Sequence, residues 1–166
     1  MTKKVGIGSD HAGFEAKEAI KKYLTREGIE FEDFGTFSTD SCDYPDYARK
    51  VADAVSKGEC DRGVLCCGSG IGVSIVANKV RGIRAALCHD AETARLSRQH
   101  NDSNVICFAG RTTSVPTIEE SLKQWFDTPF EGGRHQKRVE KIEQVRAGES
   151  PHTSHEGETQ SWYSIH

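Results

Sequence analysis

Residues 63–79, GVLCCGSGIGVSIVANK, place two adjacent cysteines directly before a glycine-rich turn. An apolar run ends at Cys66 and Cys67, and a helix-like stretch follows the glycines. Glycines at the start of a helix let backbone N–H groups turn toward an anion, which the helix dipole also favours. A cysteine at that place is favoured as the thiolate, the form that acts as base or nucleophile. Three interpretations compete: core packing, a nucleotide-binding loop, or a reactive thiolate beside an anion site.

The glycine spacing argues against the nucleotide-binding loop. The stretch GSGIG lacks the full dinucleotide-binding spacing, it follows the third expected strand rather than the first, and no phosphate-binding lysine follows it. The turn therefore suits a small anion or an oxyanion better. Side-chain alternation favours Cys67 as the reactive thiol, because Cys66 shares a strand face with Val64 and is expected in the core. Packing of both cysteines remains the alternative.

Further polar side chains follow the ends of other expected strands. Asp10 and His11 follow the first strand, His89 and Asp90 the fourth, and Arg111 the fifth. Ligands of parallel sheets bind outside the carboxyl ends of the strands, so we expect these groups near the cysteine turn. Taken alone, an Asp-His pair after a strand is as often an ordinary helix cap.

The elements that must position these residues alternate along the chain. Apolar runs predict five strands, at residues 4–8, 29–34, 63–67, 83–88 and 104–110. Helical periodicity predicts helices between and after them, the last at 134–146. Gly28 and Gly58 stand where helices should end, and Asp43 and Asp90 where helices should begin. The pattern predicts a three-layer α/β/α Rossmann-like domain with a five-stranded parallel sheet.

Composition is that of an ordinary globular protein. The 166 residues suit one domain, expected at 1–147, with a polar, flexible extension at 148–166. A net charge of −3 indicates neither a nucleic-acid nor a membrane partner. Neither a signal peptide nor an apolar run of about 20 residues is present, so we expect a soluble, cytoplasmic protein. The six cysteines include no CxxC pair, and no His, Cys and Asp cluster has metal-ligand spacing, so no metal is expected.

Five motifs occur in order from the first strand to about residue 146: GSDHAGFEAK, DYPDYA, CGSGIGVSIVANK, SRQHNDSNV and EGGRHQKRVEKI. In these motifs the chain resembles the type B ribose-5-phosphate isomerases, whose family also includes galactose-6-phosphate and allose-6-phosphate isomerases. The resemblance implies an aldose–ketose isomerase that interconverts ribose 5-phosphate and ribulose 5-phosphate through an enediolate. It implies neither a metal nor a cofactor.

The resemblance also implies catalytic roles. Cys67 matches the family's cysteine base, and Val73 stands where another branch carries a glutamate base. His100 resembles the residue that opens the furanose ring, a task that suits an imidazole near neutral pH. Asp10 contacts sugar hydroxyls or assists proton transfer, and Ser69 keeps the hydroxyl where many relatives carry threonine. The backbone N–H groups of the loop suit the developing oxyanion; they belong to Gly68, Ser69, Gly70, Ile71 and Gly72.

Substrate-binding roles follow from the same resemblance. His11 lies toward the phosphate, Tyr44 lines the pocket, and Asn101 matches a ligand of a substrate hydroxyl. Without the motifs, Tyr44 would be assigned to packing and Asn101 to a helix end.

The phosphate clamp is expected to be built from arginines. Arg134 and Arg138 are four residues apart, hence on one helical face, and can hold one phosphate together. Arg111 is the third cation by family match. Without the motifs, the pair would be assigned to a solvated surface, and His135 between them has no assigned role.

Family members are dimers or tetramers, and the resemblance implies that His100, Asn101 and Arg111 enter the site from a neighbouring subunit. We therefore expect a homodimer or tetramer with a shared site for a small-molecule sugar phosphate. Two alternatives stay open: an isomerase of a six-carbon sugar phosphate, and a non-catalytic phosphosugar-binding module. Retention of Cys67 and His100 argues against the second.

Overall fold

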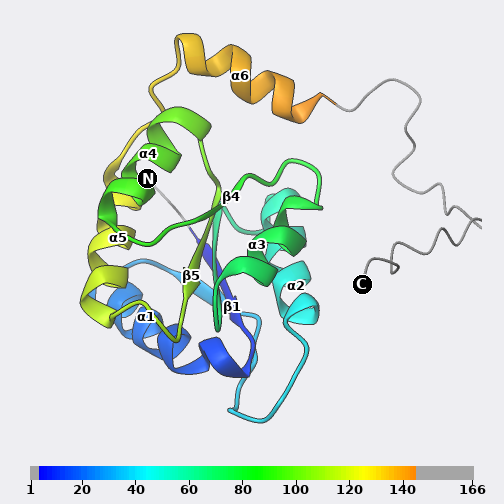
Figure 1. Cartoon of the computed structure of the whole chain (residues 1–166), viewed down its shortest axis with the longest axis vertical. Coiled ribbons are helices and arrows are strands. Elements are labelled where there is room, and N and C mark those ends of the chain that lie inside the picture. The colour runs from blue at the N-terminus through cyan, green and yellow to red at the C-terminus, as the bar shows by residue number, and fades with distance from the viewer. Residues whose placement is uncertain (1–3, 145–166) are drawn as a thin grey trace, which may run out of the picture.

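A computed structural model describes residues 4–144, so the extension expected at 148–166 lies outside the described residues (Figure 1). Five strands form one sheet: β1 (Val5–Ser9), β2 (Phe31–Asp33), β3 (Arg62–Cys67), β4 (Ala85–Leu87) and β5 (Val105–Ala109). All neighbouring strands pair in parallel, in the order β2-β1-β3-β5-β4. The predicted five-stranded parallel sheet is confirmed.

Helices cover both faces of this sheet (Figure 1). They are a short 3-10 helix η1 (His11–Gly13), α1 (Phe14–Arg26), α2 (Tyr44–Ser56), α3 (Ile71–Asn78), α4 (Ala91–Asn101), α5 (Val115–Asp127) and α6 (Arg134–Glu143). Helices α1, α4 and α5 contribute to one apolar core cluster, and α2 and α3 to the other. This confirms the three-layer α/β/α arrangement. Within residues 4–144 no helix is long and apolar enough to span a membrane.

Side-chain alternation along β3 separates the adjacent cysteines. Val64 and Cys66 pack in the cluster under α1 and α5, whereas Leu65 and Cys67 pack in the cluster under α2 and α3. Successive strand residues point to opposite faces, so neighbours in sequence enter different cores. Cys66 is fully buried, as predicted, and Cys67 is 5% exposed at the strand's end.

The helix boundaries follow their capping chemistry. The Asp90 carboxylate accepts the Thr93 N–H at 2.7 Å, and the Thr93 hydroxyl completes a capping box. Helices α1 and α2 end just before Gly28 and Gly58, whose positive φ angles stop them as expected. Asp43 does stand at the start of α2, but among the described residues its side chain makes no capping hydrogen bond.

Helix α6 lies at the amino ends of the strands, opposite the end that carries η1 (Figure 1). Arg84, just before β4, pairs with Glu143 near the end of α6. Its guanidinium also donates to the carbonyl of Asn101 at 2.9 Å and to that of Asp102 at 2.9 Å. Because the last carbonyls of a helix lack intrahelical partners, these bonds complete the end of α4 and attach α6 to it.

We expect Gly70→Ala to destabilise the fold more than Gly28→Ala. Both glycines have positive φ, 73° and 68°, so each alanine carries a left-handed strain of about 1–2 kcal/mol. A Cβ at Gly70 would also lie 2.5 Å from Leu87 Cδ1, whereas at Gly28 no described heavy atom lies within 4 Å. This overpacking adds about 1–3 kcal/mol at Gly70 alone. Urea unfolding measures both losses, and equal losses would contradict the close approach.

Candidate active site

An open cleft of about 740 Å³ lies at the carboxyl ends of the strands. After β1 the chain continues to β2 on one side, and after β3 it continues toward β4 and β5 on the other. Parallel sheets leave a crevice at such a change of direction. Nine of the predicted site residues line this cleft: Asp10, His11, Tyr44, Cys67, Gly68, Ser69, Ile71, Gly72 and Arg111.

Cys67 is placed by the start of α3. Its Sγ accepts the backbone N–H of Gly70 at 3.1 Å, one residue before the helix begins at Ile71. Gly70 itself adopts a left-handed conformation, which glycine takes without strain. A donated hydrogen bond and a helix N-terminus both favour negative charge on sulfur. By contrast, burial raises the pKa of the Cys66 thiol far above its ordinary value, so Cys66 stays protonated.

Asp10 and His11 stand at the opposite wall of the cleft. The Asp10 carboxylate accepts the Gly13 N–H at 2.9 Å and so caps η1, which means that it is both a helix cap and a cleft residue. The Cys42 N–H lies 3.2 Å from His11 Nδ1. Because a backbone N–H only donates, Nδ1 accepts this bond and the neutral ring carries its proton on Nε2. His11 is thus prepared to donate a hydrogen bond to an anion.

Tyr44 and Arg111 complete the cleft around the glycine loop. A Cβ at Gly72 would lie 2.7 Å from two carbons of the Tyr44 ring, so only glycine lets this ring approach the loop. The Arg111 N–H donates to the Gly68 carbonyl at 3.2 Å, and the Arg111 side chain lies along the loop. The expectation that Arg111 enters from a neighbouring subunit is therefore wrong. The reason is that β5 pairs directly with β3, so Arg111 follows the strand beside Cys67.

The side chains of His89, Ile71 and Ile75 line the cleft but were given no role from the sequence, where only the backbone N–H of Ile71 was assigned. His89, which follows β4, lines the cleft, and its position after a strand was the available signal. Ile71 and Ile75 also line it and are 52% and 55% exposed. Their spacing of four along α3 gives the cleft an apolar rim on one helical face.

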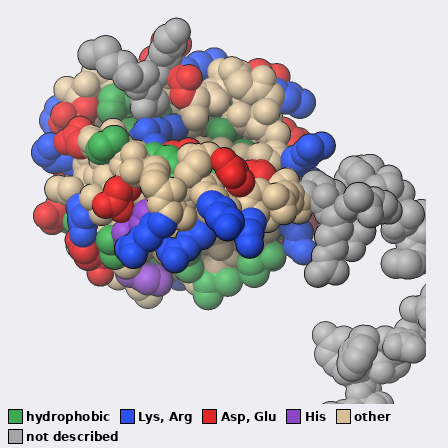
Figure 2. All heavy atoms as spheres, turned by 90° about the horizontal axis from the view of Figure 1, so that it is seen from above, with side chains coloured by type: hydrophobic (Ala, Val, Ile, Leu, Met, Phe, Trp, Pro, Cys, Tyr) green, Lys and Arg blue, Asp and Glu red, His purple; other side chains and the backbone are tan. Residues whose placement is uncertain are grey.

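Of the other five predicted residues, Gly70 lies in the loop and bonds to Cys67, and four lie elsewhere in the chain. Among the described residues, His100, Asn101, Arg134 and Arg138 do not line the Cys67 cleft. Helix α4 starts after the carboxyl end of β4 and runs back along the sheet for 11 residues. At a rise of 1.5 Å per residue this is about 16 Å, so His100 and Asn101 reach the opposite edge. Figure 2, seen from the α6 end, shows Lys and Arg side chains gathered there with His side chains beside them.

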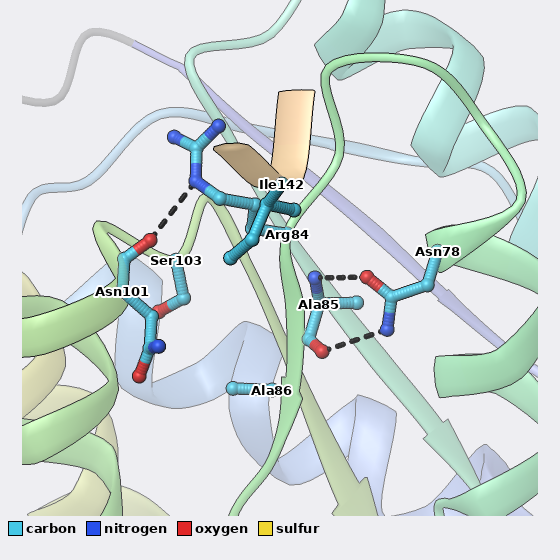
Figure 3. A pocket seen from close by; sticks show the side chains of 7 residues that line it. All are labelled: Asn78, Arg84, Ala85, Ala86, Asn101, Ser103 and Ile142. Carbon is cyan, nitrogen blue, oxygen red and sulfur yellow. Dashed lines mark hydrogen bonds between the residues drawn. The ribbon is translucent and has the colours of Figure 1, made fainter. Parts of the chain in front are cut away.

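Asn101 lines a second, smaller cavity of about 250 Å³ (Figure 3). Arg84 and Ile142 enclose it from the β4 and α6 sides, and Figure 3 shows Arg84 bonded to the Asn101 carbonyl. Across the cavity the Asn78 amide group donates to the Ala85 carbonyl at 2.9 Å and accepts the Ala85 N–H at 2.8 Å. Since these polar groups already bond to one another, the cavity offers few partners to a ligand.

His100, Glu131 and His135 meet although they are distant in sequence. Their potential ligand atoms lie within 4.8 Å of one another, a grouping that the spacing of residues in the sequence did not indicate. The geometry nonetheless disfavours an ion. The two rings stack with an interplanar angle of 14°, so their lone pairs do not converge on one point. In addition, Arg134 Nε lies 3.5 Å from His135 Nε2 and brings a positive charge to the same nitrogen.

Comparison with known proteins gives one consistent result. The family model described as Ribose/Galactose Isomerase matches residues 5–142. The chain is 48% identical over 140 residues to ribose-5-phosphate isomerase B of Escherichia coli (strain K12), an alignment that covers 84% of this chain and 94% of the relative. A solved ribose 5-phosphate isomerase structure from Thermotoga maritima has a TM-score of 0.84 at 49% identity and covers 86% and 98% of the two chains. The type B ribose 5-phosphate isomerase of Trypanosoma brucei has a TM-score of 0.83 at 51% identity, with the same coverage.

We expect iodoacetamide to alkylate Cys67 faster than the other buried cysteines. Cys42 is only partly buried and would react independently, so Cys42→Ser is the background for the measurement. In that background Cys67 has both access to the cleft and the Gly70 N–H, whereas Cys66 has neither access nor a charged form. Peptide mass mapping over time gives the rates, and faster labelling of Cys66 would contradict the assignment.

Proposed function

The chain belongs to the ribose/galactose isomerase family and is a sugar-phosphate isomerase, and we propose that it interconverts ribose 5-phosphate and ribulose 5-phosphate with Cys67 as the base. The observation that carries the proposal is the Cys67 sulfur at 3.1 Å from the Gly70 N–H, in a cleft that also holds Asp10 and Arg111. Isomerisation of an aldose phosphate requires a base to move the proton, hydrogen-bond donors for the oxyanion and a cation for the phosphate.

The reaction moves one proton between adjacent carbons. The Cys67 thiolate removes the C2 proton of the open-chain aldose, and the electron pair moves through C1 to O1, which becomes the enediolate oxygen. Backbone N–H groups at the start of α3 stabilise that charge. The Cys67 thiol then returns the proton to C1, while the O2 proton passes to O1 through Ser69 or Asp10, and the ketose results. Each group ends in its starting protonation state.

Ring opening precedes this step for the furanose form of the substrate. We assign it to His100, which takes the proton of the anomeric hydroxyl and gives it to O4 as the C1–O4 bond breaks. Asn101, beside it, holds a substrate hydroxyl. The phosphate is held by Arg111 and His11 on the cleft side and by Arg134 and Arg138 on the α6 side.

These assignments require two copies of the chain in one site. His100 and the α6 arginines lie at the sheet edge opposite Cys67, so they reach the same substrate only from a second copy. The exposed Ile71 and Ile75 at the cleft rim support this arrangement, because a neighbouring subunit would cover their apolar surface. The proposed assembly is a homodimer with the site shared between subunits. A tetramer would consist of two such homodimers.

We expect Cys67→Ala to lower kcat for ribose 5-phosphate by about 10²–10⁴-fold, the usual contribution of a positioned general base. The matched control is Cys66→Ala, the same change one residue earlier, which should keep kcat and cost roughly 1 kcal/mol of core packing. Initial rates and urea unfolding measure both variants. Normal turnover by the Cys67→Ala variant would show that Cys67 is not the base. If the wild-type protein had a higher kcat/KM for allose 6-phosphate or galactose 6-phosphate than for ribose 5-phosphate, the substrate would be a six-carbon sugar phosphate instead.

Mixed subunits test the shared site. Co-expressed Cys67→Ala and His100→Asn chains, each inactive alone on ribose 5-phosphate, should recover about a quarter of wild-type activity in a randomly assorted dimer population. The reason is that half of the dimers are mixed and each mixed dimer has one intact site. Differently tagged chains let the mixed dimer be isolated and assayed. Absence of recovery in the isolated mixed dimer would show that Cys67 and His100 do not serve one substrate across subunits.

A further inference from the structure

His135 is a buried imidazole on α6 that the proposed mechanism does not use. It is 5% exposed, and its ring stacks on that of His100 with 4.4 Å between the ring centroids. His100 is the last residue but one of α4, and its side chain is 38% exposed. If no other group packed against it, an exposed imidazole at the end of a helix would rotate freely about its two side-chain torsions. The His135 ring therefore limits the orientations that His100 can adopt.

A carboxylate approaches both rings from the same side. Glu131 Oε2 lies 3.3 Å from His135 Nε2 and 3.8 Å from His100 Nε2. The backbone fixes this residue, because the Glu131 N–H donates to the Gln99 carbonyl at 3.1 Å in the last turn of α4. A carboxylate at these distances stabilises an N–H or a positive charge at Nε2 of either imidazole.

Other charged side chains on α4 and α6 also act on His100 and His135. Arg134 and Arg138 act on His135 from α6, and Glu92, on α4, interacts with His100. Arg95 faces Glu131 but also bonds to Glu92 and Gln99. Near His135 the arginines thus outnumber the carboxylates, which favours a neutral ring there.

Burial first, and then the charges of His100 and Arg134, lower the pKa of His135 below its ordinary 6.5. Since the folded chain binds this proton less tightly than the unfolded chain, protonation opposes the fold, and stability falls as the pH drops below about 6.5. At neutral pH the ring that stacks on His100 is therefore neutral.

We propose that His135 and Glu131 are positioning residues for His100, which they hold in one ring plane with a carboxylate at its Nε2 for the ring-opening proton transfer. This inference rests on the proposed function, in which His100 opens the furanose ring. A packing role for His135 alone would not need Glu131 to approach both nitrogens.

Three variants and one control test the proposal. His135→Leu removes the flat ring, His135→Phe keeps a flat ring without nitrogens, and Glu131→Gln keeps the side-chain size without the charge. Because Glu131 is a surface residue, its variant is expected to fold even if a change at His135 perturbs α6. Gln136→Ala is the control, since Gln136 is an exposed neighbour on α6 whose side chain bonds to Glu140 instead.

Two reactions are measured for each variant. Conversion of ribose 5-phosphate requires ring opening, whereas exchange of the C1 protons of ribulose 5-phosphate with D2O, followed by NMR, reports only enediolate formation from an open-chain sugar. We expect His135→Leu and Glu131→Gln to lower kcat for ribose 5-phosphate by about tenfold, with KM and C1 exchange little changed. His135→Phe should recover part of that loss, and Gln136→Ala should match the wild type.

Two further readouts separate positioning from packing. Glu131→Gln should shift the part of the kcat–pH profile that depends on His100 protonation to lower pH, because a carboxylate favours the protonated imidazole. In a double-mutant cycle, His135→Leu should cost nothing more once His100→Asn is present, since it acts through His100. Equal losses of conversion and exchange, an unshifted kcat–pH profile or additive losses would each overturn the positioning role.

The His100→Asn variant distinguishes this inference from the proposed function. If His100→Asn loses ribose 5-phosphate conversion but keeps C1 exchange, while the His135 and Glu131 variants behave like the wild type, the positioning role alone fails. If His100→Asn keeps conversion, the assigned role of His100 fails, and the positioning role fails with it.

Discussion

The parallel pairing of β3 between β1 and β5 is the constraint on which the site depends. It directs three carboxyl ends to one edge of the sheet, so that Asp10, Cys67 and Arg111 converge although about 100 residues separate the first from the last. The register also fixes the face of each side chain. A shift of β3 by one residue would place Cys66 at the cleft face and Cys67 in the opposite core.

Helix α4 imposes the second constraint, which is one of distance. It begins at the cleft edge with a capping box and ends at the other edge, where Arg84 binds its last carbonyls. A straight helix of this length cannot bring both of its ends to one substrate. The residues on the α6 side and the residues on the Cys67 side of one chain therefore cannot meet at one substrate, which is why the proposed mechanism draws them from two copies.

The sequence allowed the elements and the Cys67 loop to be predicted because their signals are local. Apolar runs, glycine stops and the Asp90 cap each act within a few residues, and the alternation along β3 was enough to distinguish Cys67 from Cys66. The side on which Arg111 lies depended on strand order, which a pattern of alternating elements leaves open. The contact among His100, Glu131 and His135 depends on how α6 packs against the end of α4. This tertiary packing leaves no periodic pattern in the sequence from which it could have been predicted.

The side chain of Asn78 has a consequence for how copies of this chain associate. Strand β4 is an outermost strand of the sheet, and its unpaired backbone groups would offer a template to a strand from another molecule. The Asn78 amide occupies both the N–H and the carbonyl of Ala85, the first residue of this three-residue edge strand, as a neighbouring strand would. An incoming strand would have to displace this amide before it could extend the sheet. Edge-to-edge polymerisation through β4 is thereby disfavoured.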